Sequence, residues 1–148
     1  MSDTNDSKPT DWNTWNQFNE NLVAEFRANN GKVSGMFAEM PLILITHTGA
    51  KSGQKRCSPL VYTKDGDRIV IIASKGGAPK HPHWYLNMLA DPKVTVELPG
   101  EKFEARAVVV SGDERARLYR AQADAMPNFD EYAAKTDREI PVVVLERV

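Results

Sequence analysis

The sequence is poor in the residues that build disulfide frameworks and metal centres. Among its 148 residues it has one cysteine, Cys57, and three histidines, His47, His81 and His83. A lone cysteine excludes an internal disulfide and is typical of a protein of the reducing cytoplasm. Tetrahedral zinc needs four protein ligands, or three and a water, and no cysteine pair supports these histidines. We therefore expect a cytoplasmic protein without a metal site.

Long apolar runs and an excess of one charge are also missing. No stretch of about eighteen apolar residues occurs, so the sequence predicts no membrane-spanning helix. The first ten residues are polar, lack the features of a signal peptide and are expected to be disordered. Lysine and arginine number 19 against 20 aspartates and glutamates, a formal net charge of −1. This balance argues against nucleic-acid binding through bulk charge, so any anion site must be a local cluster.

The composition is that of a single soluble domain over residues 1–148, with 41% hydrophobic and 26% charged residues. Over residues 11–30, apolar side chains recur at helical spacing. They are Trp12, Trp15, Leu22, Val23 and Phe26. The pattern predicts an amphipathic N-terminal helix that packs on the domain, with contact to a membrane surface or a partner left open. Gly31 is expected at the C′ position that ends this helix.

Six apolar runs of strand length follow. They cover residues 41–45, 57–63, 68–74, 93–98, 103–110 and 140–146. Asp65-Gly66, between the second and third runs, is a strong hairpin signal. Helices are predicted over 81–90, with Pro82 in the first helical position, and over 113–125 and 128–135. Because strands and helices do not alternate, we expect a mainly β fold. It should be a small barrel of about six antiparallel strands over residues 41–148, decorated by helices.

Two loops carry polar groups suited to a ligand. The first, T-H-T-G-A-K-S-G-Q-K-R-C-S-P at residues 46–59, combines two glycines with the cations Lys51, Lys55 and Arg56. Glycine-bent backbone exposes N–H groups and the cations add charge-assisted donors, so the loop suits a phosphate or a row of carboxylates. The alternative is a solvated hairpin turn, because turns are rich in the same residues.

The second loop, A-S-K-G-G-A-P-K at residues 73–80, follows a predicted core strand. A Gly-Gly pair at this place lets the backbone approach a bound group closely. The sequence shows no phosphate-binding P-loop, since Ala50 stands where the second glycine is needed, and no readable Ser-His-Asp triad. Two ligand-cradling loops without an obvious protein nucleophile favour a bound cofactor that performs the chemistry.

Three blocks of the sequence resemble one family. They are T-G-A-K-S-G-Q-K-R-x-S-P-L, A-S-K-G-G-A-x-K-H-P-x-W-Y-L-N and T-D-R-x-I-P-V-V-V-L, within a similarity that runs from about Pro41 to the C-terminus. They look like the deazaflavin-dependent nitroreductases, which are quinone and nitro reductases that use reduced coenzyme F420. The fold of that family is a split β-barrel related to the one that binds flavin mononucleotide, which agrees with the predicted strands.

The resemblance implies where the cofactor binds. Its anionic phosphate and oligoglutamate tail would be held by Lys51, Ser52, Gly53, Gln54, Lys55, Arg56, Ser58 and Pro59. Its ring would be lined by the backbone of Ala73, Ser74, Lys75, Gly76 and Gly77. The other side of the pocket would be closed by His81, Pro82, Trp84 and Tyr85. Many relatives have arginine where Ala50 stands, so this chain is expected to lack one tail contact.

The resemblance also implies hydride transfer to a quinone, enone or nitroaromatic acceptor. Ser74 would hydrogen-bond an acceptor oxygen as negative charge develops there, and Tyr132 would do the same from the opposite side. Met126 and Phe129 would line the acceptor pocket with Tyr132. Some relatives have tyrosines there, so the pocket of this chain is more apolar and nitroimidazoles are less expected than quinones. For Tyr132 and Phe129, plain packing of a short helix is the alternative.

Two other functions remain open from the sequence. The protein could bind a deazaflavin or another lipophilic ligand without turning it over, or it could use flavin mononucleotide on the same fold. The sequence does not predict an oligomeric state.

Overall fold

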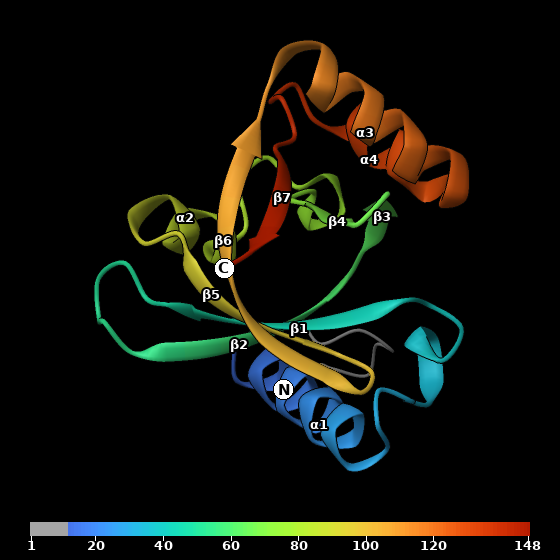
Figure 1. The fold of residues 1–148 in the computed structure, drawn as a ribbon. Coiled ribbons are helices and arrows are strands. Elements are labelled where there is room, and N and C mark those ends of the chain that lie inside the picture. Colours follow the sequence, from blue (N-terminus) through green and yellow to red (C-terminus); the bar gives the residue numbers. More distant parts are fainter. Residues whose placement is uncertain (1–11) are drawn as a thin grey trace.

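The structure, a computed structural model, describes residues 12–148 apart from the side chains of residues 12–16 and of Met36. The expected disorder of residues 1–10 and the packing of the Trp12 and Trp15 side chains therefore lie outside what it describes. Within this range the chain forms one curled antiparallel sheet with four α-helices around it (Figure 1).

Seven strands make up the sheet. They are β1 (Leu42–Thr48), β2 (Lys55–Val61), β3 (Thr63–Asp65), β4 (Arg68–Ile72), β5 (Lys93–Leu98), β6 (Glu101–Val110) and β7 (Val142–Arg147). Their order is β2-β1-β5-β6-β7-β4-β3, so the consecutive strands β2 and β3 lie at opposite edges of the sheet. Only Tyr62 separates these two strands. Because one residue spans at most about 3.5 Å, the sheet must curl until its two edges meet at Tyr62.

The strand predictions need two corrections. The run over residues 57–63 was expected to be one strand, but Tyr62 carries the chain from one sheet edge to the other and divides it. The first strand continues to Thr48, because Thr46, His47 and Thr48 keep pairing with β2 as far as Lys55. The loop predicted over residues 46–59 is therefore only the six-residue hairpin loop 49–54, which we call the cationic loop.

The core lies on both faces of the central strands. In β7, Val143 and Leu145 belong to the cluster inside the curled sheet, whereas Val142 and Val144 belong to a second cluster under the C-terminal helices. Successive side chains of a strand point to opposite faces, so a run without alternation is buried on both. The runs over residues 41–45, 68–74 and 140–146 thus form core strands, whereas β2 and β6 have no uninterrupted buried stretch.

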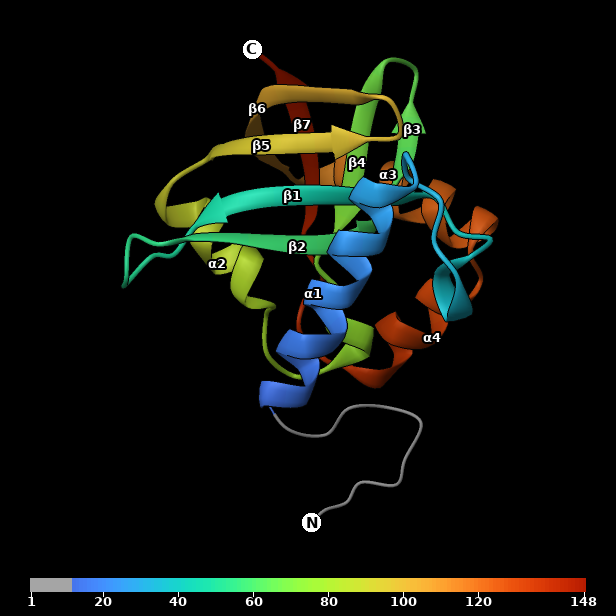
Figure 2. The same cartoon turned by 90° about the horizontal axis from the view of Figure 1, so that it is seen from below.

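Helix α1 (Trp12–Ala28) lies across β1 and β2 (Figure 2). Leu22, Val23 and Phe26 are buried there, as the helical pattern predicted. The helix ends where Asn30 takes a φ of +54° and the Gly31 N–H bonds the Phe26 carbonyl at 2.8 Å. This is a Schellman-type end with Asn30 at C′, so the prediction of Gly31 at that position was wrong.

The other helices are α2 (His83–Ala90), α3 (Gly112–Ala125) and α4 (Asn128–Lys135), together with the short 3₁₀ turns η1 (Gly35–Phe37) and η2 (Lys75–Gly77). Pro82 has a φ of −67° and a ψ of 151°, so it precedes α2 as an extended residue instead of opening it. Helices α3 and α4 pack together beside β7 and β4 (Figure 1). Among residues 12–148, no helix combines the length and the apolar character needed to cross a bilayer.

Candidate functional site

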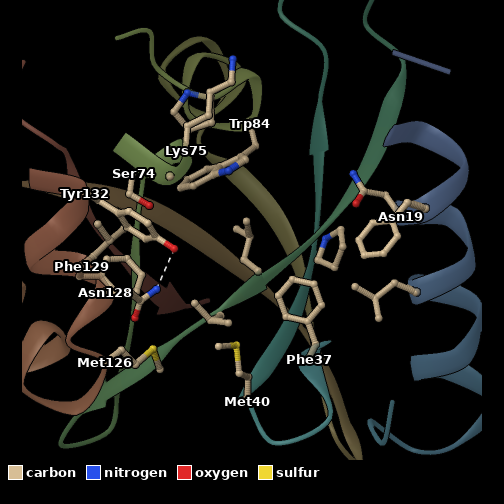
Figure 3. A pocket seen from close by; sticks show the side chains of 18 residues that line it. Asn19, Phe37, Met40, Ser74, Lys75, Trp84, Met126, Asn128, Phe129 and Tyr132 are labelled. Carbon is tan, nitrogen blue, oxygen red and sulfur yellow. Dashed lines mark hydrogen bonds between the residues drawn. The ribbon is translucent and has the colours of Figure 1, made fainter. Parts of the chain in front are cut away.

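A cavity of about 470 Å³, the main cavity, opens between the curled sheet, α1 and α4 (Figure 3). Four segments of chain build its walls: α1 with its following connector, β2, the end of β4 with η2 and the start of α2, and α4 with the residue Met126 before it. The predicted site residues that line it are Pro59, Ser74, Lys75, Gly76, Pro82, Trp84, Met126, Phe129 and Tyr132. The fold thus brings together the predicted ring-side loop and the predicted acceptor residues.

The same cavity has lining residues that the sequence did not reveal as site residues. They are Phe18, Asn19, Leu22, Phe37, Met40, Leu60, Val61, Ile72 and Asn128. Most of them are apolar, and their helix or strand pattern is that of ordinary core residues. The aromatic load of α1 was the one available signal, and it was read as packing. Figure 3 shows Asn19 and Phe37 across the cavity from Ser74 and Tyr132.

The turn η2 forms the wall that carries Ser74. Three successive residues, Lys75, Gly76 and Gly77, have positive φ angles of 47°, 63° and 83°. A Cβ added at Gly76 would meet nothing within 4 Å, so this glycine leaves open space at the cavity wall. A Cβ at Gly77 would lie 2.8 Å from the Tyr132 carbonyl. The close approach predicted for the glycine pair is therefore, at Gly77, an approach to α4.

Helix α4 adds the hydroxyl of Tyr132 to this wall. The Asn128 amide donates to Tyr132 Oη at 2.8 Å, and the Phe129 and Tyr132 rings meet edge to face at 5.1 Å. Since the Tyr132 backbone lies against Gly77, Tyr132 and Ser74 stand on the same wall (Figure 3). The expectation that Tyr132 faces Ser74 from the opposite side was wrong.

Four predicted ring-side residues lie behind this wall. Ala73 is fully buried, and its N–H bonds the Pro141 carbonyl. The Gly77 N–H is used within the turn, where it bonds Ser74 O at 2.9 Å. His81 and Tyr85 pack against each other with ring centres 4.9 Å apart and do not line the cavity. These residues shape the wall instead of forming its surface.

The cationic loop is held by its own backbone. The Gly49 N–H bonds Gln54 O at 2.8 Å, and the Gly53 N–H bonds Gly49 O at 2.9 Å. Ser52 Oγ accepts the Gln54 N–H at 3.1 Å. Gly53 has a φ of +72°, so it supplies the bend that the sequence suggested. The loop is thus a defined hairpin end that carries the exposed Lys51 and is followed directly on β2 by the exposed Lys55 and Arg56.

The predicted tail-binding cations divide between two hollows. One, of about 480 Å³, lies between the cationic loop and α2 and is lined by Lys51, Ser52 and Arg56 among others. The other, of about 460 Å³, lies between α1 and β2 and includes Lys55, Arg56 and Arg27. Arg56 lines both because β2 is the edge strand of the sheet. Gly53 and Gln54 line neither hollow.

A buried polar chain ties the cationic loop to the barrel. Asn87 Oδ1 accepts the Ala50 N–H at 2.9 Å, so the Asn87 amide nitrogen donates to His47 Nδ1 at 3.0 Å. His47 is therefore protonated at Nε2, which donates to Ser58 Oγ at 2.8 Å. Burial, and next the charge of Arg56, lower the pKa of His47 to about 4. His47 is thus neutral at pH 7 and serves to connect β1, β2 and α2.

The main cavity and the cationic loop are neighbours along β2. Arg56 lines the hollow at the loop and Pro59 lines the main cavity. Three residues of a strand span about 10 Å. The two places therefore lie within the length of one elongated ligand with an anionic end and a flat apolar end.

Comparison with known proteins agrees with this arrangement. The family model described as F420H(2)-dependent quinone reductase matches residues 19–147. An F420H(2)-dependent quinone reductase of Mycobacterium tuberculosis is 38% identical over 128 residues, which cover 84% of this chain and 86% of that protein. A solved structure of an F420-H2 dependent reductase has a TM-score of 0.66 and 42% identity, covering 72% of this chain and 94% of that one. A further solved structure, described only as a domain-swapped dimer, has a TM-score of 0.68 and 36% identity, covering 90% of this chain and 98% of that one.

These matches confirm the resemblance and the split β-barrel that it implied. A heme storage protein of Vibrio cholerae, only 13% identical, shares the fold with a TM-score of 0.57. The family match also begins at residue 19, earlier than the predicted start near Pro41, so it includes most of the α1 residues that line the main cavity. This chain belongs to the F420H(2)-dependent quinone reductase family.

Proposed function

We propose that this protein transfers a hydride from reduced coenzyme F420 to a quinone in the main cavity. The observation that carries this function is the pairing of an apolar cavity at Ser74 and Gly76 with a cationic loop about 10 Å away along β2. Coenzyme F420 has the matching form, with a flat deazaflavin ring and an anionic tail. The family match and the names of the relatives support the same cofactor and acceptor.

The residues present fit this cofactor. Gly76 leaves open space at the wall of the main cavity, as close contact with a ring requires. Lys51, Ser52 and Arg56 offer charge-assisted or hydroxyl donors to the tail. When bound, the reduced ring supplies the hydride. The tasks left to the protein are to orient the two partners and to exclude water from the space between them.

Ser74 and Tyr132 would polarise the acceptor from one wall. The Asn128 amide donates to Tyr132 Oη, so the phenol proton of Tyr132 is free to donate elsewhere, toward an acceptor oxygen. Ser74 is 7% exposed and lines the same wall, so its hydroxyl can reach the same ligand. Donors aimed at an oxygen that gains negative charge lower the barrier to hydride addition.

The lining favours a quinone over the alternative enone and nitroaromatic acceptors. Met126 and Phe129, both on the acceptor side, offer no hydrogen-bond donors to a nitro group. Phe37 and Met40 extend the apolar surface on the far side of the cavity (Figure 3). This apolar surface suits the ring of a quinone, and Ser74 could supply a donor at one of the quinone oxygens.

Turnover in the presence of a quinone tests this function. Purified protein is mixed with reduced F420 and menadione, and the absorbance of the oxidised cofactor is followed. We expect saturable oxidation that requires both the protein and the quinone. The absence of both cofactor binding and turnover would contradict the proposal. Tight binding without turnover of any acceptor would indicate a non-catalytic carrier, and a protein that is yellow as purified would indicate flavin mononucleotide.

Contact of α1 with a membrane surface is a separate proposal, as is a cytoplasmic location. The face made by Leu22, Val23 and Phe26 is buried against the sheet, so only the remaining surface of the helix can reach a bilayer. Glu20 on that surface is exposed and would repel anionic lipid. Sedimentation with vesicles of neutral and of anionic lipid tests the contact, and protein that stays in both supernatants contradicts it.

A further inference from the structure

We propose that Arg138 is the positioning residue of the cavity wall. It holds the backbone of residues 73–78 so that the wall turns N–H groups, and not carbonyl groups, toward the main cavity. The effect on a bound ring rests on the proposed function. The effect on the wall does not, because it can be measured without any ligand.

The guanidinium of Arg138 uses all three of its nitrogens on this segment. Nε donates to Ala78 O at 2.9 Å, Nη1 to Ala73 O at 3.2 Å and Nη2 to Ser74 O at 2.8 Å. Nη1 also lies 3.1 Å from His81 Nδ1, which must accept because arginine only donates. A planar fork of five N–H donors can bind these four acceptors in one geometry, and lysine cannot.

This grip fixes the direction of two peptide units. In a trans peptide the C=O and N–H groups point in opposite directions. Arg138 binds the carbonyls of Ala73 and Ser74, so the N–H groups of the same units, on Ser74 and Lys75, point away from it. Both of these residues line the main cavity. Neither N–H has a backbone acceptor among the described residues, so both remain available to a ligand.

The local conformation agrees with this direction. Ser74 is right-handed, with φ −79° and ψ −35°, and Lys75 follows with a positive φ of 47°. A right-handed residue followed by a left-handed one turns successive N–H groups to one side, where they favour an anion. Lys75 is not a glycine, so its conformation is strained and needs outside support. The contacts of Arg138 supply that support.

The charge of Arg138 is not neutralised by a neighbouring carboxylate. Arg27, Arg117 and Arg120 each form an ion pair, with Glu97, Asp65 and Asp130 respectively. Among the described side chains Arg138 forms none. Its positive charge therefore polarises the two peptide units and favours the more electron-rich form of a ring bound in front of them.

Amide hydrogen exchange of the ligand-free protein tests the effect on the wall. The N–H groups of Gly77 and Ala78 bond within the segment, to Ser74 O and Lys75 O. In Arg138→Gln we expect both to exchange at least about tenfold faster, while the Gly53 N–H in the cationic loop keeps its rate. Arg106→Gln, an exposed arginine on β6, is the matched control. Unchanged rates at Gly77 and Ala78 would overturn the positioning role.

The ratio of two dissociation constants tests the effect of the charge. If Arg138→Gln only disturbed the structure, the binding of oxidised F420 and of reduced F420 would be weakened by the same factor. We expect Arg138→Gln to weaken binding of the reduced form at least about threefold more than binding of the oxidised form. Arg138→Lys, which keeps the charge, should regain much of the preference for the reduced form. An equal loss for both forms would overturn the electrostatic part.

The two readouts separate this role from the proposed function. If the wild-type protein binds no deazaflavin, the proposed function fails and the exchange rates alone decide the role of Arg138. If Arg138→Gln does not fold, Arg138→Lys takes its place in the exchange measurement, because lysine cannot span the four acceptors. Unchanged rates in Arg138→Lys would then overturn the role.

Discussion

Arg56 is exposed on the edge strand and lines the hollows on both sides of it. Its environment has no acidic partner among the described side chains, in contrast to Arg27, which is paired with Glu97. A cation at this place can change its contacts to meet a flexible anionic tail. The prediction of a tail site here rests on this charge and on the loop composition.

Replacing Arg56 with Glu should weaken F420 binding at least about tenfold, because it turns a favourable contact with the anionic tail into repulsion. A deazaflavin without a tail should bind as before. Fluorescence titration of both ligands at low salt measures this. Arg106→Glu, the same charge change on β6, should alter neither constant. An unchanged constant for F420 in Arg56→Glu would show that the arginine is only surface.

Replacing Ser74 with Ala should lower kcat for quinone reduction at least about tenfold, because it removes a donor to the oxygen that gains charge. Binding of F420 should change little, since the backbone of the wall stays in place. Steady-state rates at saturating cofactor give the effect. Ser111→Ala, which removes a hydroxyl that makes no capping bond, is the control. A kcat equal to that of wild type would remove Ser74 from the chemistry.

At the scale of elements, η2 shows two glycines with different tasks. Gly76 faces open space at the cavity wall, and Gly77 lies against the Tyr132 backbone of α4. The same short turn therefore shapes the ligand surface on one side and the packing of a helix on the other. The Gly-Gly sequence by itself does not indicate which glycine has which task.

The two alanine variants of this pair should separate stability from binding. Gly77→Ala should lower the free energy of unfolding by about 2 kcal/mol or more, because its φ is +83° and its Cβ would lie 2.8 Å from the Tyr132 carbonyl. Gly76→Ala should cost only about 1 kcal/mol but should weaken binding of a tail-less deazaflavin. Urea unfolding and ligand titration measure both. Equal unfolding free energies for the two variants would contradict the arrangement of η2.

The sequence predicted those elements whose signal is local. The apolar strands, the four helices and the two polar loops follow from periodicity, hairpin residues and composition. The division of the second strand at Tyr62 did not follow, because it depends on closure of the sheet and not on the residue itself. The α1 residues in the cavity and the placement of Tyr132 beside Ser74 were missed for the same reason, since only the tertiary fold brings them together.

At the scale of the molecule, the curl of the sheet creates the site. Because β2 and β3 lie at opposite edges yet are joined by one residue, the edge at β2 is brought toward η2 and α4. Helix α1 covers the outer side of β1 and β2 (Figure 2), and Phe18, Asn19 and Leu22 of this helix complete the lining of the cavity. The site therefore depends on the barrel as a whole.

Stability should depend on pH through His47. Its folded pKa of about 4 lies below the value of about 6.5 in the unfolded chain, so the unfolded chain binds more protons between these values. The stabilisation is complete above pH 6.5 and is lost as the pH falls toward 4, by up to about 3 kcal/mol. Urea unfolding at several pH values measures it.

A non-titrating variant isolates this contribution. His47→Gln should be less stable at pH 7 and should show a flatter dependence between pH 6.5 and 4. Burial also lowers the pKa of His81, so this residue adds a loss of stability of the same sign at low pH in the wild type and in His47→Gln. Ser111→Ala, which removes no titratable group, should keep the wild-type slope. An equally steep loss in His47→Gln would show that His47 is not its source.

A crystal structure of the protein with F420 tests the two-part site most directly. We expect the deazaflavin ring in the main cavity against Ser74, Lys75 and Gly76, and the tail along β2 toward Arg56 and Lys51. A ring bound outside the main cavity, or a tail directed away from the cationic loop, would contradict it.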